Sequence, residues 1–504
     1  MEKIAFVSIC SSVSESIKRH SINRVIINLF VCLVVFGIFG IAGCSDTDSD
    51  SASGPNSPFV EGPFLAAPSE SPFKLSVNGK CGMESSDTMI FTPDSESDAL
   101  IAVNPTNSDN IVAAFMQDLG LSTSIAASFD KGETWTEVIP QELSRCTGGV
   151  DEGFADQAIV FEKNGTLHLF ALTGTFTPPW GSPVEWRFDG TMNLVSSIVA
   201  YRSTDGGLTW SGPTVISPSG DYQHQCMAAT DPNIEGRVYV VWAVAYNPDA
   251  VGTGYLDDNT TYVSRSDDSG LTWSDPVKVM DASFISDMRV LTDGSIIAAT
   301  TTNTSVSEDG GLTWSEMRPI SIPNNTGMWN HPEAKNGLLV SGGSLNMANG
   351  PDGSLYHVGV SEPESGQVWL AKSLDKGATW EPEKMVVDSD GYVCFAHSAV
   401  APNGNIGVMW YDTREDEPDD GKIITRVYFA VSKDDGDTWT ELQVSEPFDR
   451  NLSGTGWDLY LYLGDYQSVM SLEESDFITG FTVAPPVALA GGADLQFARI
   501  IVPE

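Results

Sequence analysis

Short apolar runs alternate with tight polar turns along most of the chain. Pairs of apolar runs, each pair joined by a short turn, recur seven times. Four of the turns carry Asn-Gly or Asp-Gly, the strongest short-range signals for a β-hairpin. The seven predicted hairpins cover residues 97–116, 155–172, 223–243, 285–300, 344–360, 394–411 and 464–482. The pattern therefore predicts an all-β protein with little helix.

An octet of residues lies after each of the first six hairpins. It holds Ser, Asp, Gly, Thr and Trp at fixed offsets. The six copies are SFDKGETW at 128–135, STDGGLTW at 203–210, SDDSGLTW at 266–273, SEDGGLTW at 307–314, SLDKGATW at 373–380 and SKDDGDTW at 432–439. The Asp accepts backbone hydrogen bonds two residues on, the Gly supplies a positive φ, and the Trp covers the turn. We expect each octet to be a structural turn and not a reactive site.

The octet resembles the Asp box of the sialidase-like β-propellers. This resemblance implies four-stranded blades, each built from a hairpin (strands A and B), strand C, the Asp-box turn and strand D. The last hairpin is followed by a strand C at 493–501 and then by the chain end. We predict that residues 86–92 supply its strand D, because closure by both termini removes open edges. Seven blades are favoured, and six is the alternative because enzymatic sialidases resemble six-bladed rings.

The N-terminus reads as an export signal. A basic stretch precedes an apolar run, 25–41, that is shorter than the roughly 20 residues of a membrane span. The run ends in Ile-Ala-Gly-Cys44, which resembles a bacterial lipobox. We predict a lipoprotein signal peptide at 1–43, a lipid on Cys44, a flexible Ser/Asp-rich tether at 44–58 and a single propeller at 59–504. An ordinary signal peptide with a coincidental Cys is the alternative.

The lipobox predicts an exported protein that is anchored to a membrane by its N-terminal lipid. Ser45 follows the Cys, which in such lipoproteins resembles an outer-membrane sorting signal. The outer membrane or the cell surface is therefore the expected location.

The net charge argues against one class of partner. The 68 Asp and Glu residues against 26 Lys and Arg give a formal net charge of −42. Such a surface repels phosphates, so no nucleic-acid partner is expected.

Four cysteines follow the tether, at 81, 146, 226 and 394. They allow three pairings, and Cys81–Cys146 is the first expectation.

No cofactor is predicted from the sequence. It contains no Gly-rich phosphate loop, no His-Glu-x-x-His and no zinc spacing. Calcium binding and the oligomeric state stay open.

Candidate site residues come from one mouth of the propeller channel. Strand A of every blade begins there, and the D-to-A and B-to-C connections surround it, so residues from many blades converge. The residues at these positions are Asp156, His224, Asp287, Arg289, His397, Asp412, Arg414, Asp465 and Tyr466. Because side chains alternate faces along a strand, about half of them are expected to point away from the channel.

The chemistry of this set suggests glycoside hydrolysis. Asp287, Asp465 and Tyr466 are the catalytic candidates, since glycosidases use paired carboxylates and sialidases use a Tyr nucleophile. Arg414 and Arg289 are candidates to bind a substrate carboxylate bidentately. The remaining predicted substrate-binding residues are Asp156, His224, His397 and Asp412. A glycan is therefore the expected substrate or ligand.

Two short motifs resemble one bacterial branch of the superfamily. They are Trp-Tyr-Asp-Thr-Arg at 410–414 and Gly-Asp-Tyr at 464–466. Structural alternatives remain for both: Asp412 and Arg414 pair with each other, and Tyr466 packs between blades.

One sialidase feature is absent. No Phe/Tyr-Arg-Ile-Pro motif precedes the first octet, and Arg237 falls in an A-to-B turn at the opposite mouth. An exo-sialidase-like hydrolase is favoured, with a non-catalytic binding propeller or a polysaccharide lyase as alternatives.

Overall fold

The computed structural model describes most of the chain after the tether. The described residues are 57–65, 96–117, 122–144, 147–151, 153–177, 193–245, 259–282, 284–321, 327–330, 333, 338–341, 347–360, 362–453, 463–484 and 493–503. Residues 52–504 form one compact unit, distinct from residues 1–51. The predicted signal peptide, Cys44 and the Cys81–Cys146 pair lie outside the described residues. Cys226 and Cys394 are buried free thiols.

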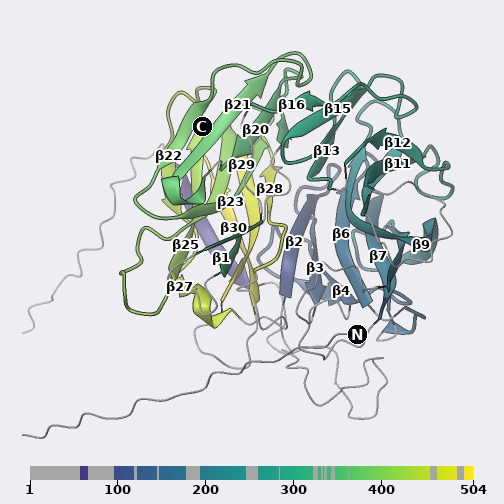
Figure 1. Cartoon of the computed structure of the whole chain (residues 1–504), viewed down its shortest axis with the longest axis horizontal. Coiled ribbons are helices and arrows are strands. Elements are labelled where there is room, and N and C mark those ends of the chain that lie inside the picture. The colour runs from purple at the N-terminus through teal and green to yellow at the C-terminus, as the bar shows by residue number, and fades with distance from the viewer. Residues whose placement is uncertain are drawn as a thin grey trace, which may run out of the picture. The chain divides into compact units, whose positions relative to one another are not determined.

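Seven four-stranded antiparallel blades make up the described part of this unit, which confirms the predicted propeller and its blade number (Figure 1). Blade 1 is β2 (Glu96–Val103), β3 (Ile111–Gln117), β4 (Ser122–Ser128) and β5 (Thr136–Val138). Blade 2 is β6 (Gly153–Phe161), β7 (Leu167–Thr177), β8 (Asn193–Ser203) and the first part of β9 (Ser211–Thr230). Blade 3 is the second part of β9, β10 (Val238–Ala245), β11 (Thr260–Ser266) and β12 (Val277–Met280). Blade 4 is β13 (Asp287–Val290), β14 (Ile296–Ala299), β15 (Asn303–Ser307) and β16 (Arg318–Pro319).

The other three blades follow the same order. Blade 5 is β19 (Met347–Asn349), β20 (Leu355–Gly359), β21 (Gln367–Ser373) and β22 (Lys384–Asp388). Blade 6 is β23 (Val393–Val400), β24 (Ile406–Asp412), β25 (Ile424–Ser432) and β26 (Thr440–Gln443), with β27 (Phe448–Asp449) paired to β25. Blade 7 is β28 (Ser468–Leu472), β29 (Asp476–Val483), β30 (Asp494–Ile501) and β1 (Phe59–Leu65). A hairpin of β17 (Gly327–Asn330) and β18 (Leu338–Ser341) and two 3-10 turns, η2 (Pro363–Ser365) and η3 (Arg450–Leu452), complete the described elements.

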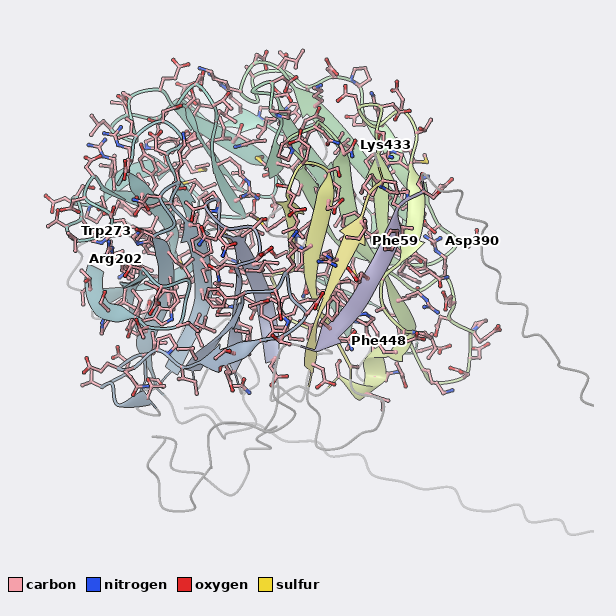
Figure 2. All side chains as sticks on the ribbon, turned by 180° about the vertical axis from the view of Figure 1, so that it is seen from behind. Phe59, Arg202, Trp273, Asp390, Lys433 and Phe448 are labelled. Carbon is pink, nitrogen blue, oxygen red and sulfur yellow. The ribbon has the colours of Figure 1, made fainter. Side chains whose placement is uncertain are left out.

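The first strand of the domain closes the ring. β1 pairs with β30 in antiparallel register, and Figure 2 shows it, with Phe59 labelled, against the C-terminal strands. The prediction of an N-terminal closing strand is confirmed, but its assignment to 86–92 was wrong. β1 contains Gly62-Pro63, a pair that is unfavourable inside a strand, so its sequence carries a weak strand signal. The ladder tolerates Pro63 because β1 is an edge strand and its register shifts between Glu61 and Phe64.

The inner strands form a closed circle around the channel. Contacts run from β2 to β6, β9, β13, β19, β23 and β28 and back to β2, and Figure 1 shows β28 beside β2. The buried apolar side chains of the described residues form seven clusters, one at each interface between neighbouring blades. Each blade is thus apolar on both faces and needs two neighbours, which is the reason why the chain closes into a ring.

The octets are hairpin turns between strands C and D, as predicted. In the first, the Ser128 hydroxyl donates to Asp130 and accepts from the backbone N–H of Gly132, while Asp130 accepts from both the N–H and the hydroxyl of Thr134. The Trp135 indole donates to the carbonyl of Gly132. The same Ser, Asp and Thr bonds recur in the other five octets. These side chains are fully used in holding the turns.

Acid should weaken all six octets together. Hydrogen bonds from Thr313 lower the pKa of Asp309 to about 2, and the octet bonds also lower the pKa of Asp130, Asp268 and Asp375. A lowered folded-state pKa gives stability that is present above the unfolded-state pKa of about 3.9 and is lost as pH falls toward the folded value. We therefore expect the free energy of unfolding to fall between about pH 4 and pH 2. Urea titrations across this range check it, and Asp309→Asn should show a shallower pH dependence. An equal pH dependence in Asp309→Asn would contradict the assignment.

Candidate functional site

Four inner strands carry an extra residue near their starts. The A–B ladder shifts register there, and the extra residues have positive φ: 59° at Asp98, 50° at Asp156, 51° at Gln225 and 54° at Phe395. A bulge of this kind re-aims the neighbouring side chains. The regular alternation of side chains between the two faces of a strand is therefore interrupted at the predicted mouth, so it does not tell which side chains face the channel.

Carboxylates at this mouth tie neighbouring blades together. Asp98 of blade 1 accepts from the backbone N–H groups of Asp465 and Tyr466 in blade 7. Asp156 Oδ2 of blade 2 accepts from the N–H of Gln225 in blade 3 at 2.8 Å. Such bonds satisfy strand-start N–H groups that have no ladder partner. These carboxylates therefore have a structural role, because they join neighbouring blades.

The Gly-Asp-Tyr motif at 464–466 forms the contact between blades 7 and 1. Gly464 has a φ of 95°, and a Cβ there would lie 2.5 Å from the backbone nitrogen of Asp98. Only glycine allows this approach without displacing backbone. The motif thus places the backbone N–H groups of Asp465 and Tyr466 within hydrogen-bond distance of the Asp98 carboxylate. Asp98 was missed from the sequence, although it holds the blade 1 position equivalent to Asp156.

Tyr466 crosses the channel. Its hydroxyl donates to Asp156 Oδ1 at 3.2 Å, and the two residues belong to blades 7 and 2, which are not neighbours. The ring is 1% exposed and packs in the same cluster as Met227 and Met288. Burial raises the pKa of Tyr466 well above its usual value, and the nearby carboxylates, first Asp156 and then Asp465, raise it further. The structure thus brings three predicted site residues together: Asp156, Asp465 and Tyr466.

A second group joins Asp287 and Arg289 on β13. The Arg289 Nη2 donates to Asp287 Oδ2 at 3.1 Å, and its Nε donates to the carbonyl of Met347 in blade 5. Asp287 Oδ2 also accepts from the Met347 N–H at 2.9 Å. Asp287 is buried, and this burial raises the pKa of its carboxyl despite the adjacent guanidinium.

A third group, Asp412 and Arg414, lies at the end of β24. Asp412 accepts from the backbone N–H, Nε and Nη2 of Arg414 and from the Trp410 indole. The Arg414 guanidinium also binds Glu441 and stacks over the Tyr428 ring, 4.2 Å from its centroid. Both partners lie in the outer part of blade 6. The arginine is therefore engaged in the pairing that the sequence left as its alternative.

The two predicted histidines lie on the inner strands of blades 3 and 6. His224 is half-buried on β9 next to the bulge, and His397 is buried in β23. Their predicted role in substrate binding stays a prediction. Within the described ranges, no group of three or more His, Cys, Asp and Glu side chains is arranged to hold a metal ion. No helix in the same part of the chain is long and apolar enough to cross a membrane.

Polar side chains gather at the end of the propeller where strand A of each blade begins. Asp98, Asp156 and Asp287 lie at such strand starts, and Tyr466 precedes β28. The A-to-B turns at the opposite end are short, such as 162–166 and 291–295. The Tyr466 end is therefore the candidate ligand-binding face.

Comparisons with known proteins give a family. The model of the BNR repeat-like domain matches residues 122–408, and no curated protein matches the chain. Similar solved structures include a protein of unknown function from Dyadobacter fermentans, with 16% identity over 69% of this chain and 94% of that chain and a TM-score of 0.44. A Hadza microbial sialidase has 15% identity over 78% of this chain and 74% of its own, with a TM-score of 0.42. An α-L-arabinofuranosidase from Fusarium graminearum has 12% identity over 88% of this chain and 98% of its own, also with a TM-score of 0.42.

The matched segment covers more than half of the 504 residues and runs from strand C of blade 1 into blade 6. It contains five of the six octets completely. The chain therefore belongs to the BNR repeat-like domain family of sialidase-like propellers.

Proposed function

We propose that this protein is a glycoside hydrolase that cleaves a glycan at the Tyr466 end of its propeller. The observation that carries the proposal is the hydrogen bond from the Tyr466 hydroxyl to Asp156 Oδ1 across the channel. A phenol is a weak nucleophile unless an adjacent base takes its proton. The pair supplies a phenol and a carboxylate base within hydrogen-bond reach, which is the arrangement that a tyrosine nucleophile requires.

The proposed reaction has two balanced steps. In the first, the Tyr466 oxygen bonds to the anomeric carbon, the phenol proton passes to Asp156, and the bond to the leaving oxygen breaks as Asp465 protonates that oxygen. In the second, water attacks the anomeric carbon while Asp465 takes its proton, and Asp156 returns its proton to Tyr466. The raised pKa of Tyr466 supports concerted transfer to Asp156, because free phenolate is disfavoured there.

Glycan binding without cleavage is the second candidate. It is favoured by the burial of Tyr466, whose ring is 1% exposed, and by the engagement of Arg414 with Asp412 and Glu441. A binding propeller needs the rigid face but no accessible nucleophile.

The test is a sugar-release assay on residues 52–504. Sialylated and uronic-acid-rich glycans are incubated with the protein, and released sugars are identified by mass spectrometry. The proposal expects a free saturated sugar whose release is lost in Asp156→Asn. An unsaturated uronic product would show that the reaction is β-elimination and not hydrolysis. Binding without any product would leave the second candidate.

We also propose export and membrane attachment through a lipid on Cys44. The support is the charged, apolar and small-residue order of residues 18–44. We expect the full chain expressed in a bacterium to fractionate with the membrane, and the Cys44→Ser chain to leave that fraction, because one acyl chain contributes about 0.8 kcal/mol per buried CH₂. Fractionation with intact-mass measurement checks this. Equal membrane recovery of both chains would contradict it.

A further inference from the structure

The octets and the A-to-B turns share one end of the propeller, opposite to Tyr466. Neighbouring strands of a blade are antiparallel, so strands A and C of each blade finish at the same end. The A-to-B turns and the octets, which are the C-to-D turns, therefore lie together. We call this end the octet end.

The chain enters the propeller at the octet end. β1 is strand D of blade 7, and its first residue, Phe59, pairs with Ile501, the last residue of strand C. Phe59 thus lies where an octet turn lies in the other blades. Lys433 of the sixth octet donates to the carbonyl of Pro503, close to the same place, at 2.8 Å (Figure 2). The segment that follows Cys44 is therefore attached to the octet end.

The length of that segment favours one orientation on a membrane. Thirteen peptide bonds separate Cys44 from Ser57. A chain of this length spans at most about 45 Å, and its root-mean-square span is about 20 Å. A strand of eight residues, such as β2, is about 26 Å long. A lipid on Cys44 thus reaches a membrane at the octet end with an unstretched chain, whereas a membrane at the Tyr466 end requires the chain to pass along a whole blade.

Exposed apolar side chains gather at the same end. Eleven large apolar side chains are exposed in the described part of the chain. One of them, Val150, lies in a D-to-A connection at the Tyr466 end. Five belong to the octets, and they are Phe129, Leu208, Leu271, Leu312 and Leu374. A group of exposed apolar residues on one face marks a protein or membrane contact.

Three of these residues occupy the same octet position in adjacent blades. Leu208, Leu271 and Leu312 are the sixth octet residues of blades 2, 3 and 4, and they are 39%, 67% and 59% exposed. The turn itself does not need a leucine there, because Glu, Ala and Asp occupy the sixth position in the other three octets. The leucines are therefore available for a contact outside the propeller.

The charges at the octet end select the kind of lipid. Hydrogen bonds from Thr313 lower the pKa of Asp309 to about 2, so this carboxylate is charged at neutral pH beside the exposed Leu312. Each of the other octets holds an Asp at the equivalent position. Anionic lipid would be repelled by these carboxylates, whereas a zwitterionic headgroup presents an ammonium cation at its outer end, which attracts them.

We propose that the octet end of blades 2, 3 and 4 rests on a membrane surface of zwitterionic lipid, so that the Tyr466 end faces away from the membrane. Leu208, Leu271 and Leu312 then lie among the lipid headgroups. The proposal rests on the proposed attachment through Cys44. It leaves the candidate ligand-binding face open to glycans in the surrounding solution.

Photolabelling from the lipid tests this contact. The full chain, purified from a bacterium with its lipid, is placed in phosphatidylcholine vesicles that contain a phosphatidylcholine with a diazirine near its headgroup. After irradiation, adducts are mapped by peptide mass spectrometry. We expect the peptides of octets 203–210, 266–273 and 307–314 to be labelled at least about tenfold more than the peptide containing Tyr466, since transfer of one leucine from water favours a contact by about that factor. Equal labelling of the two ends would overturn the proposal.

A triple variant and a matched control locate the contact. The combined Leu208→Asp, Leu271→Asp and Leu312→Asp variant should lose at least about tenfold in octet labelling. The turn accepts this change, because Asp437 holds the same position in the sixth octet. Val150→Asp, at the Tyr466 end, should be labelled as the unaltered chain is. Thermal unfolding identifies which variants are folded, and undiminished octet labelling in a folded triple variant would overturn the proposal.

The lipid composition tests the selection by charge. Replacement of the bulk phosphatidylcholine by phosphatidylglycerol should lower octet labelling, because the octet carboxylates then face an anionic surface. Equal or stronger labelling in phosphatidylglycerol would overturn the choice of a zwitterionic lipid.

A second kind of attachment separates the contact from the lipidation. Residues 45–504 with an N-terminal hexahistidine tag are bound to the same vesicles through a nickel-chelating lipid, which holds the same end of the segment whatever the chemistry at Cys44. Octet labelling in this arm, together with an unmodified Cys44 in the full chain, would contradict the lipid and support the contact. No octet labelling in either arm would overturn the contact.

Discussion

Tyr466→Phe should reduce glycan cleavage by residues 52–504 at least about 10³-fold, since removal of a nucleophile costs up to about 10⁶ in turnover. The substitution removes one oxygen and leaves the ring, which is buried in the cluster between blades 3 and 4. Asp156 keeps its bond from the Gln225 N–H, so the joint between blades 2 and 3 is preserved. The measurement is the initial rate of sugar release from the most active glycan of the panel.

A matched control separates chemistry from packing. Tyr201 is also buried, and its hydroxyl donates to the carbonyl of Gln141 at 2.8 Å, on strand C of blade 2 and away from the channel. Tyr201→Phe should cost about 1 kcal/mol of stability and leave the rate unchanged. Equal rates for the Tyr466→Phe and unaltered chains would remove Tyr466 from the reaction.

Deletion of β1 should open the ring and destabilise the protein by on the order of 5 kcal/mol, about one for each of five ladder pairs. That is comparable with the whole stability of a typical domain, about 5–15 kcal/mol. Residues 66–504 would expose the edge of β30, whose partners in β1 run from Phe59↔Ile501 to Leu65↔Gln496. An uncovered edge also promotes aggregation.

Urea unfolding of residues 66–504 beside residues 52–504 measures this effect. We expect a lower midpoint for the shorter chain, and partial recovery when a peptide of residues 57–65 is added. Coincident unfolding curves would show that β1 does not close the ring.

The blades were predictable because their signals are local. Asn-Gly and Asp-Gly turns fix the hairpin register, and the octets mark the turns between strands C and D. The closing strand was assigned to the wrong residues because Gly62-Pro63 weakens the strand signal of 59–65, although an edge strand tolerates this pair.

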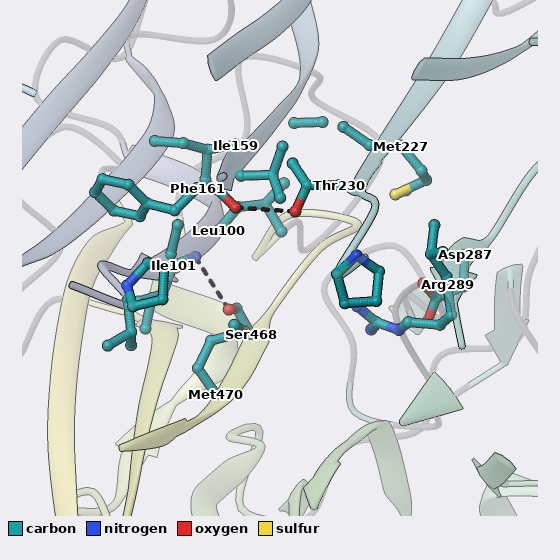
Figure 3. Close-up of a pocket in the computed structure, with 18 of the residues that line it drawn as sticks. Leu100, Ile101, Ile159, Phe161, Met227, Thr230, Asp287, Arg289, Ser468 and Met470 are labelled. Atoms are coloured by element: carbon teal, nitrogen blue, oxygen red, sulfur yellow. Dashed lines mark hydrogen bonds and ion pairs between the residues drawn. The ribbon is translucent and has the colours of Figure 1, made fainter. Parts of the chain in front are cut away.

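The site was predictable only in part. Asp156 and Tyr466 were found by position, yet their contact across the channel depends on the bulges at Asp98 and Asp156, which an alternating pattern does not reveal. Arg414 was expected to face a ligand, whereas its partners lie on outer strands of blade 6. A cavity of about 470 Å³, lined by the inner strands of blades 1, 2, 3, 4 and 7 (Figure 3), depends on side-chain volumes, including those of Ala102 and Ala228, which no local pattern encodes.

The central claim is that the Tyr466–Asp156 pair cleaves glycosidic bonds through a covalent intermediate. Its most direct measurement is the intact mass of residues 52–504 after incubation with fluorinated glycosyl fluorides of a sialic acid and a hexuronic acid. Fluorine beside the anomeric centre slows breakdown of a glycosyl-enzyme, so the intermediate accumulates. We predict one glycosyl adduct that maps to the peptide containing Tyr466 and is absent from Tyr466→Phe. No adduct from either reagent, together with retained glycan binding and no sugar release, would contradict the claim.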